Sequence, residues 1–590
     1  MLNAKRLSLH FDFDRSRVQT FLALLVILAL AAYMRLQGLH WDDLAGLHPD
    51  ERHMLFLTQE LLAGLNDSDH AWRGLADWWF ALESPLNPHQ GDRFLVYGQA
   101  PLLAVVVLAH TLGLSDWFEV MLLARTVAAT VDIAAILAVF FGGRLLSGGA
   151  AGLWVAAIYA TMPSALQLAR FHTVDIWLAS ASAAALLPLL ALALGRGKSQ
   201  AAPWLGLAAG AMIGLALASK ITGIVMVLAA FCALVLARQR GLGRWHTLVT
   251  AVAMFAAAAL VFRLANPFAF VGNGFWGLAI NPMWINSFRT LESMTTSSDF
   301  PPNWQWEAGY GPGAFFRDVA LFGTGPVAAG LFLWLLLTYR GAWGALLVPL
   351  TTVFAFLLLT HASSVNALRY LAPALPALAM SLAPLAVRLY RPAVLGTILL
   401  ALWWGSGAFR LGDGQHPRLI ASYWLWSLPE GTVLTNESDW DEGLPVIIRD
   451  VAGDGFRFPS HDNWFRFQTL GITDPDSPEK ADRIARLLEK TDFLIMSSDR
   501  QSAVMPRLPE RFPMTAEHYA ALFSGAACFR PVLILERGYP LPLFPFDDSW
   551  AQEPWRIYDH PPVRIFAREA CYDAQSYSNY LRAALEPDTR

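Results

Sequence analysis

The chain has 590 residues, of which 55% are hydrophobic and 15% are charged, and its mean hydropathy is +0.39. Soluble globular proteins are less apolar and more charged, so the composition excludes a cytosolic enzyme. With a net charge of −4 and no long basic tract, nucleic acid is not an expected partner. Residues 411–590 carry 27 acidic and 18 basic side chains, whereas residues 1–410 carry 20 and 25. We therefore expect a membrane module over 1–410 and a soluble domain over 411–590.

Apolar runs long enough to cross a bilayer recur through the first part. Lys5, Arg6, Arg15 and Arg17 precede the first run, and Arg35 follows it without a cleavage site, which indicates an uncleaved helix rather than a signal peptide. About eleven transmembrane helices are predicted, at 18–36, 117–141, 153–169, 174–194, 204–219, 221–237, 245–264, 315–338, 345–360, 371–387 and 393–409. The outer loops are expected at 37–116 and 265–314.

The apolar run 101–114 decides the topology. A full span there would place five later basic loops opposite the basic N-terminus. These loops contain Arg144, Arg196 with Lys198, Arg238 with Arg240 and Arg244, Arg340, and Arg388 with Arg391. That arrangement violates the positive-inside rule. Fourteen residues are also fewer than the roughly 20 that a span needs, so we predict an interfacial or re-entrant segment. The N-terminus is then cytoplasmic and residues 411–590 are extracytoplasmic.

The second outer loop is rich in aromatic residues, and the tail has a different pattern. Trp304 and Trp306 belong to this loop, where an interfacial belt and a sugar-stacking or lipid-stacking role both stay open. The tail alternates short β-type runs with a helical stretch at 478–490, which predicts an α/β or α+β domain. Cys528 and Cys571 lie in this tail and could pair in an oxidising compartment.

Two acidic positions are candidates for chemistry on the outer side. Asp50 and Glu51 stand next to each other in the first outer loop, where one carboxylate could accept a proton from an attacking hydroxyl, or both could merely decorate a helix start. Asp175 opens a spanning segment just after Arg170 and His172. It could position an acceptor, hold a divalent ion together with Asp50, or simply pair with Arg170.

Cations at the same side are candidates for binding phosphate. Lys220 interrupts an apolar run at the outer end of a helix, and Arg369 with Tyr370 precedes another outer helix start. A lysine supplies a point charge and an arginine a forked pair of donors, and both suit a lipid phosphate at the membrane surface, although a lysine that snorkels to the interface would look the same.

Other polar residues in the membrane module support weaker interpretations. Arg125 and Asp132, seven residues apart, are expected to form a structural ion pair. The histidines, which include His53 and His172, show no zinc-binding spacing, and no metal site is predicted.

The order of these motifs resembles a known family. The outer Asp-Glu pair, Arg-Phe-His-Thr-Val-Asp at 170–175, Ala-Ser-Lys at 218–220 and Arg-Tyr-Leu-Ala-Pro-Ala-Leu-Pro at 369–376 look like the GT-C membrane glycosyltransferases. Among these, the chain is most similar to the protein O-mannosyltransferase and lipid A aminoarabinose transferase group, glycosyltransferase family thirty-nine. The resemblance covers about residues 18–409.

The resemblance implies a polyprenyl-phosphate sugar as donor and an inverting transfer to an unknown hydroxyl acceptor outside the cytoplasm, at a bacterial inner membrane. By this resemblance Asp50 is the catalytic base with Glu51 beside it, Asp175 is a second acid, and Lys220, Arg369 and Tyr370 bind the donor phosphate. His53, His172, Trp304 and Trp306 are candidates for acceptor or sugar contacts. No cofactor is firmly implied, and a divalent cation stays open. The alternative function is a transporter or flippase, although the sequence shows no clear inverted repeat.

Overall fold

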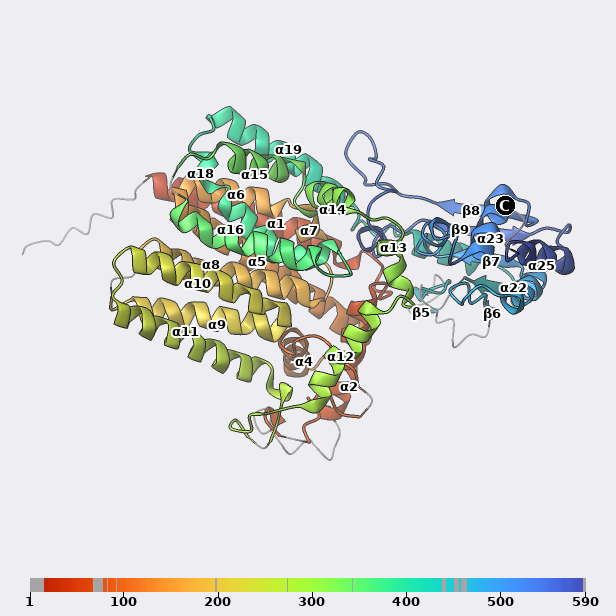
Figure 1. Ribbon diagram of the computed structural model, residues 1–590, viewed down its shortest axis with the longest axis horizontal. Coiled ribbons are helices and arrows are strands. Elements are labelled where there is room, and N and C mark those ends of the chain that lie inside the picture. Colours follow the sequence, from red (N-terminus) through yellow and green to blue (C-terminus); the bar gives the residue numbers. More distant parts are fainter. Residues whose placement is uncertain are drawn as a thin grey trace, which may run out of the picture.

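A computed structural model describes residues 15–586 except 67–77, 82, 92, 197–198, 273, 342, 438–441, 450–455 and 458–463. Lys5, Arg6 and Lys198 therefore lie outside the described residues. Figure 1 shows long helices running side by side in one bundle, with a second domain that contains the β-sheet beyond one end of it.

Eight helices in the described part of the chain are long and apolar enough to span a membrane, or nine if one bent pair counts as a single span. They are α1 (Arg15–Leu36), α5 (Trp117–Ser147), α8 (Val174–Ala193), α9 (Ala202–Ser219), η2 with α10 (Ile221–Val225, Met226–Gln239), α11 (Arg244–Ala265), η6 with α16 (Gly344–Leu346, Leu347–His361) and α19 (Arg391–Arg410). The bent pair joins α14 and η5 (Pro312–Asp318, Val319–Gly323) to α15 (Pro326–Thr338) at an angle of 116°.

The expected number of eleven spans is therefore too high by these criteria. The apolar stretch at 153–169 is divided between α6 (Gly149–Ala160) and α7 (Pro163–Leu168), with Pro163 starting the second helix. The stretch at 371–387 is divided between α17 (Ala374–Ser381) and α18 (Ala383–Ala386). Prolines near the break points favour short helices over one continuous span.

The run that decides the topology forms the 13-residue helix α4 (Ala100–Leu112). Figure 1 shows α4 end-on, whereas the neighbouring bundle helices run across the view, so α4 does not run parallel to them. Helices α2 (Pro49–Asn66) and α12 (Pro282–Thr296) also cross this end of the bundle. We call it the cavity end, because a cavity lined by residues of α2, α8 and α12 lies there. Helix α8 begins at this end with Val174, and α9 ends there with Ser219.

The basic loops gather at the opposite end of the bundle. The Arg196 guanidinium donates to the carbonyl oxygen of Leu145 at 3.2 Å, and Arg240 donates to that of Leu194 at 3.2 Å. Arg388 lies over the ring of Tyr339, 4.8 Å from its centroid. These loops therefore lie at the end where α1 begins, as the positive-inside argument requires.

Helices α9 and α11 pack closely through small residues. Gly206, Gly210 and Gly214 are four residues apart, and they face the carbonyl oxygens of α11. A Cβ on Gly210 would lie 2.0 Å from the carbonyl oxygen of Met254, so only glycine permits this approach. In a bilayer such small-residue contacts are a main source of helix association, because lipid supplies no hydrophobic driving force between helices.

The second domain contains a five-stranded mixed sheet in the order β6-β3-β7-β9-β8. Strand β3 pairs in parallel with β6 and β7, and β9 is antiparallel to β7 and β8. The elements of the domain are α20 (Pro417–Leu425), β3 (Val433–Asn436), β6 (Arg466–Thr469), α22 (Pro478–Lys490), β7 (Phe493–Met496), α23 (Pro513–Ser524), β8 (Phe529–Leu535), α24 (Glu553–Arg556), β9 (Val563–Arg568) and α25 (Ala574–Ala583). An α/β or α+β domain was expected here, and the predicted helix 478–490 has the observed bounds.

Two further small pairs of strands occur outside that sheet. They are β1 (Phe270–Val271) with β2 (Ala279–Ile280), and β4 (Ile448–Arg449) with β5 (Phe456–Arg457). Cys528 and Cys571 form a disulfide with a Cα–Cα distance of 5.8 Å, so the pairing considered from the sequence is present.

A buried histidine ties this domain to the bundle. His560 contacts Asp548 at 2.8 Å and also contacts Asp559, whose other carboxylate oxygen accepts from the Gln167 amide of α7 at 3.0 Å. Burial opposes a charge on His560, but the two carboxylates outweigh it and raise its pKa to about 9. The imidazolium is therefore positive at neutral pH and holds the junction together.

Candidate active site

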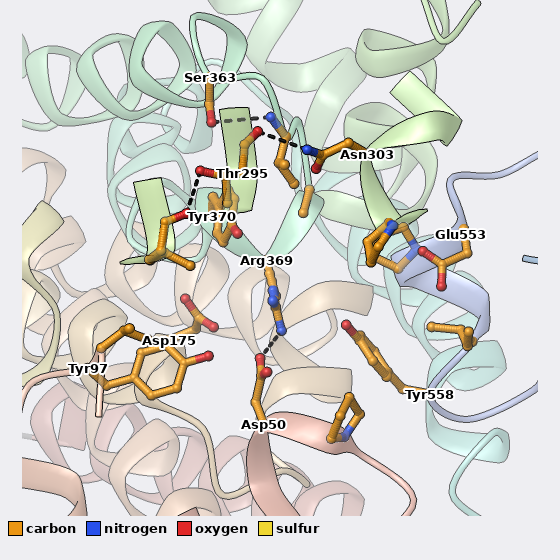
Figure 2. A pocket seen from close by; sticks show the side chains of 18 of the residues that line it. Asp50, Tyr97, Asp175, Thr295, Asn303, Ser363, Arg369, Tyr370, Glu553 and Tyr558 are labelled. Carbon is orange, nitrogen blue, oxygen red and sulfur yellow. Dashed lines mark hydrogen bonds and ion pairs between the residues drawn. The ribbon is translucent and has the colours of Figure 1, made fainter. Parts of the chain in front are cut away.

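A cavity of about 790 Å³ lies at the cavity end of the bundle, against the second domain. Six of the residues singled out from the sequence line it: Asp50, Asp175, Lys220, Trp306, Arg369 and Tyr370. Figure 2 shows Arg369 pointing at Asp50, with Tyr97 and Asp175 on one side and Tyr558 and Glu553 on the other. Groups up to several hundred residues apart in the sequence thus meet around one space.

Asp50 and Arg369 form one of the ion pairs in this cavity. Asp50 lies in the first turn of α2, where Pro49 starts the helix, so the carboxylate sits at the positive end of the helix dipole. Arg369 belongs to the 3-10 turn η7 (Leu368–Leu371), and its Nη1 donates to an oxygen of Asp50. Their side chains are 25% and 20% exposed, so both groups remain accessible from the cavity.

Lys220 and Asp175 form another of these ion pairs. The Lys220 Nζ lies 2.7 Å from Asp175 Oδ1 and 4.4 Å from the centroid of the Tyr370 ring. Lys220 ends α9 in an extended conformation, which turns the chain into η2, and Asp175 lies in the first turn of α8. The possible pairing of Asp175 with Arg170 is wrong, because Arg170 instead donates to the carbonyl oxygens of Ala408 and Phe409 at the end of α19.

The charge on Asp50 depends on its cationic neighbour. Burial by itself would raise the pKa of Asp50, but the Arg369 guanidinium, helped by Lys220, lowers it to about 2. His48 itself is buried, and burial lowers its pKa to about 3, so it is neutral at pH 7. The Asp50 carboxylate is therefore ionised, and it is a weak base as long as Arg369 stays bound to it.

Glu51 has a structural position and does not line the cavity. Its side chain is fully buried, and Arg125 donates to it through Nε at 3.0 Å and Nη2 at 2.6 Å. The same guanidinium also binds Asp42 at 2.7 and 3.0 Å, and Glu51 accepts from the backbone N–H of His172 at 2.8 Å. The structure thus separates the two adjacent acids, and Glu51 is better explained as an anchor for α5.

The expected pairing of Arg125 with Asp132 is wrong. Seven residues of helix separate these side chains by about 10 Å along the axis, which is too far for contact. Asp132 instead accepts from Arg35 Nε at 2.5 Å and from the Tyr159 hydroxyl at 2.5 Å. Arg125 and Asp132 therefore each pair with residues outside their own helix.

Three other candidate residues lie away from the cavity wall. His53 contacts the carbonyl oxygen of Phe94 at 2.6 Å. His172 is buried, which lowers its pKa to about 4, and neither ring nitrogen has a hydrogen-bond partner among the described residues. The Trp304 indole donates to the Ser298 carbonyl oxygen at 2.7 Å and packs on Phe512 of the second domain.

The second domain contributes cavity residues that the sequence interpretation missed. They are Arg418, Glu442, Arg500, Glu553 and Tyr558, and Tyr97 of the first outer loop joins them. The Arg500 guanidinium binds Glu553 at 2.6 Å, and the Gln305 amide donates to the other oxygen of Glu553 at 3.0 Å. No pattern in the sequence indicated that these residues of the second domain contact the membrane module.

Among the described residues, no group of three or more histidine, cysteine, aspartate or glutamate side chains is arranged to hold a metal ion. Asp50 and Asp175, the pair considered for a divalent ion, each contact a cationic side chain instead.

Residues 101–262 match the family model described as dolichyl-phosphate-mannose-protein mannosyltransferase. This match confirms the resemblance predicted from the sequence. Over these residues the chain is similar to membrane glycosyltransferases named for a lipid-phosphate sugar donor, which favours an enzyme over the alternative transporter. None of the curated proteins matches the sequence.

Several solved structures are similar to this chain at low identity. ArnT from Cupriavidus metallidurans, solved with undecaprenyl phosphate, is 17% identical over 83% of this chain and 94% of its own, with a TM-score of 0.46. The oligosaccharyltransferase of Archaeoglobus fulgidus is 14% identical over 89% and 75%, with a TM-score of 0.47. The Pmt1-Pmt2 complex of S. cerevisiae is 17% identical over 49% and 36%, with a TM-score of 0.33.

Proposed function

We propose that this protein transfers a sugar from a polyprenyl phosphate to a hydroxyl acceptor at the extracytoplasmic surface of a bacterial cell membrane, with inversion at the anomeric carbon. The observation that carries the proposal is the meeting of Asp50, Arg369 and Lys220 in one cavity at the bundle end opposite the basic loops. A carboxylate and two cations are what a direct displacement from a phosphate requires.

The acceptor oxygen attacks the anomeric carbon on the face opposite the phosphate. A new C–O bond forms, the bond from the anomeric carbon to the phosphate oxygen breaks, and the acceptor proton passes to Asp50. The electron pair of the broken bond stays on the polyprenyl phosphate, which leaves as an anion. Arg369 and Lys220 stabilise that charge, so no proton donor to the leaving group is needed.

Arg369 links donor binding to the strength of the base. In the present structure its guanidinium binds Asp50 and lowers the pKa of that carboxyl group to about 2. A donor phosphate within reach of Arg369 competes for the same N–H groups. Drawing Arg369 toward phosphate weakens its hold on Asp50, and the carboxylate becomes a better proton acceptor. Asp175 positions Lys220 for the same phosphate through the 2.7 Å contact.

The acceptor is proposed to approach along the wall that the second domain provides. Glu553 and Tyr558 lie across the cavity from Asp175 and Tyr97 in Figure 2. Arg500 and Gln305 there hold the Glu553 carboxylate, whose oxygens can also accept hydrogen bonds from hydroxyl groups of an acceptor.

The proposed sidedness has two supports. The basic loops lie at the end opposite the cavity, which the positive-inside rule assigns to the cytoplasm. The disulfide between Cys528 and Cys571 suits an oxidising compartment for the second domain. A reporter enzyme fused after Arg590 is expected to be active only outside the cytoplasm, and activity inside would contradict the proposal.

The test uses the full chain in lipid nanodiscs, with a panel of undecaprenyl-phosphate hexoses and pentoses and a cell-envelope extract as acceptor. Asp50→Asn is expected to slow donor consumption by about 10²- to 10⁴-fold, the usual contribution of a general base. Glu60→Gln is the matched control, because Glu60 lies on the same helix, is 53% exposed and pairs with Arg93 outside the cavity. Equal rates for Asp50→Asn and Glu60→Gln would remove Asp50 as the base.

A further inference from the structure

A projecting hairpin of the second domain lies against the spanning helix α19. It follows β8, and its stem is closed by mutual backbone hydrogen bonds between Tyr539 and Phe546, at 2.9 and 2.8 Å. Residues 540–545 read Pro-Leu-Pro-Leu-Phe-Pro, and we call them the apolar tip. Figure 1 shows this blue loop leaving the β-sheet domain and reaching the end of α19.

The stem of the hairpin is fixed firmly to α19. The Tyr539 hydroxyl donates to the carbonyl oxygen of Trp404 at 2.7 Å, and the Tyr539 side chain is fully buried. Its ring fits against Gly407, where a Cβ would lie 2.5 Å from the ring. Phe546 contacts Trp404 with a ring separation of 5.2 Å. The direction in which the tip points is therefore set by packing.

The tip itself presents apolar side chains outward. Leu543 is 97% exposed and Phe544 is 52% exposed, although both belong to a segment with a rigid base. Three prolines restrict this segment, so its exposed shape exists before any partner binds. Single exposed apolar residues are common on proteins, but a fully exposed leucine next to a phenylalanine on a projecting tip indicates an apolar partner.

The depth of the tip identifies that partner. The Phe544 ring lies 6.1 Å from the ring of Trp403, which precedes the end of α19 at Arg410 by seven residues, or about 10 Å of helix. The outward face of α19 is apolar as well, with Leu395, Leu399 and Leu400 all more than half exposed. The tip thus continues a lipid-facing surface at the level where headgroups meet acyl chains.

We propose that the apolar tip inserts Leu543 and Phe544 into the outer boundary of the bilayer beside α19. The occupant of this surface is lipid, because the tip is continuous with the lipid-facing side of a spanning helix. The insertion anchors the second domain at a point from which the chain runs directly into α24 and Tyr558. Those residues line the cavity, so the anchor holds one cavity wall in place.

Site-directed spin labelling in nanodiscs tests this proposal on the full chain. Cys232→Ala removes the free cysteine among the described residues, and Cys528 and Cys571 remain in their disulfide. A label at Leu543→Cys then reports its accessibility to oxygen, which concentrates in lipid, and to a water-soluble nickel chelate. Leu399→Cys on α19 is the lipid control, and Phe467→Cys, a 45% exposed position on β6, is the water control.

We expect the oxygen-to-nickel ratio at position 543 to shift from the value at 467 toward the value at 399. Phe544→Asp in the Leu543→Cys background is expected to move that ratio back toward the water control. A ratio equal to that at 467 would overturn the proposal and leave the tip in solvent. Low accessibility to both reagents would mean that protein covers the tip, and spin–spin broadening that disappears on dilution with unlabelled chain would identify a second copy as the cover. Either result also overturns it.

Discussion

Asp50 and Glu51 are adjacent acids, and the structure assigns them opposite roles that one pair of substitutions can separate. Asp50 faces the cavity with a quarter of its side chain exposed, whereas Glu51 is completely buried against Arg125. Asp50→Asn is therefore expected to reduce turnover and to cost less stability than Glu51→Gln. Glu51→Gln is expected to reduce stability first.

The magnitude for Glu51→Gln follows from its contacts. The substitution removes the charge that faces Arg125 and puts an amide NH2 in place of one of the two oxygens that accept from the guanidinium at 2.6 and 3.0 Å. Breaking one partner of a buried ion pair typically costs about 3–5 kcal/mol. Asp42 still contacts Arg125, so we expect a loss near the lower limit of that range.

The assay compares thermal unfolding in detergent with donor consumption measured well below the unfolding temperature. Glu60→Gln, which changes the same functional group in an exposed ion pair, is expected to alter stability by less than about 1 kcal/mol. The reasoning fails if Glu51→Gln unfolds at the same temperature as the wild type but has lost turnover, because Glu51 would then act in the chemistry.

Three further predictions concern other parts of the molecule. Arg369→Gln removes the cation that lowers the pKa of Asp50 in the free enzyme, so the acid limb of kcat/KM for the donor should lie at higher pH than in the wild type, and an unchanged pH profile would argue against the pairing. Gly210→Val places side-chain atoms against the Met254 carbonyl oxygen and should reduce the yield of folded protein in size-exclusion chromatography, whereas Gly330→Ala, at a helix position with open space, should not. His560 has a raised pKa of about 9, so its stabilising charge is fully present below pH 6.5 and is lost as the pH rises through 9. The unfolding temperature of the wild type should therefore fall over that range, and His560→Gln should show a flatter profile.

The separation of the polar candidate residues from the basic loops, at opposite ends of the bundle, was the part of the fold that the sequence predicted best. Positive charges at helix ends follow a simple rule of membrane insertion, and the short apolar run at 101–114 left one arrangement that obeyed it. The structure places Asp50, Asp175, Lys220 and Arg369 around one cavity, as that arrangement requires. The number of spans was less predictable, because hydropathy does not show where prolines divide an apolar stretch into short helices.

The details of the site needed the three-dimensional structure. Neighbouring residues on a helix point about 100° apart, so the sequence could not say which of Asp50 and Glu51 faces the cavity. The partner of Arg125 is Asp42, which precedes it by 83 residues and has no characteristic spacing. Glu553 and Tyr558 lie in a different domain, and only the folding of that domain onto the bundle brings them to the cavity.

The two ion pairs have a consequence for the electrostatics of turnover. The formal charges of Asp50, Asp175, Arg369 and Lys220 sum to zero, and a phosphodiester donor adds one negative charge. During transfer Asp50 becomes neutral while the departing lipid phosphate gains a second negative charge, so the total does not change and the charge only moves. The Arg369 guanidinium already contacts Asp50, where the negative charge starts, so a small side-chain rotation lets it follow that charge to the phosphate. The formal charge around the reacting groups therefore stays at −1 from donor binding to the end of the transfer.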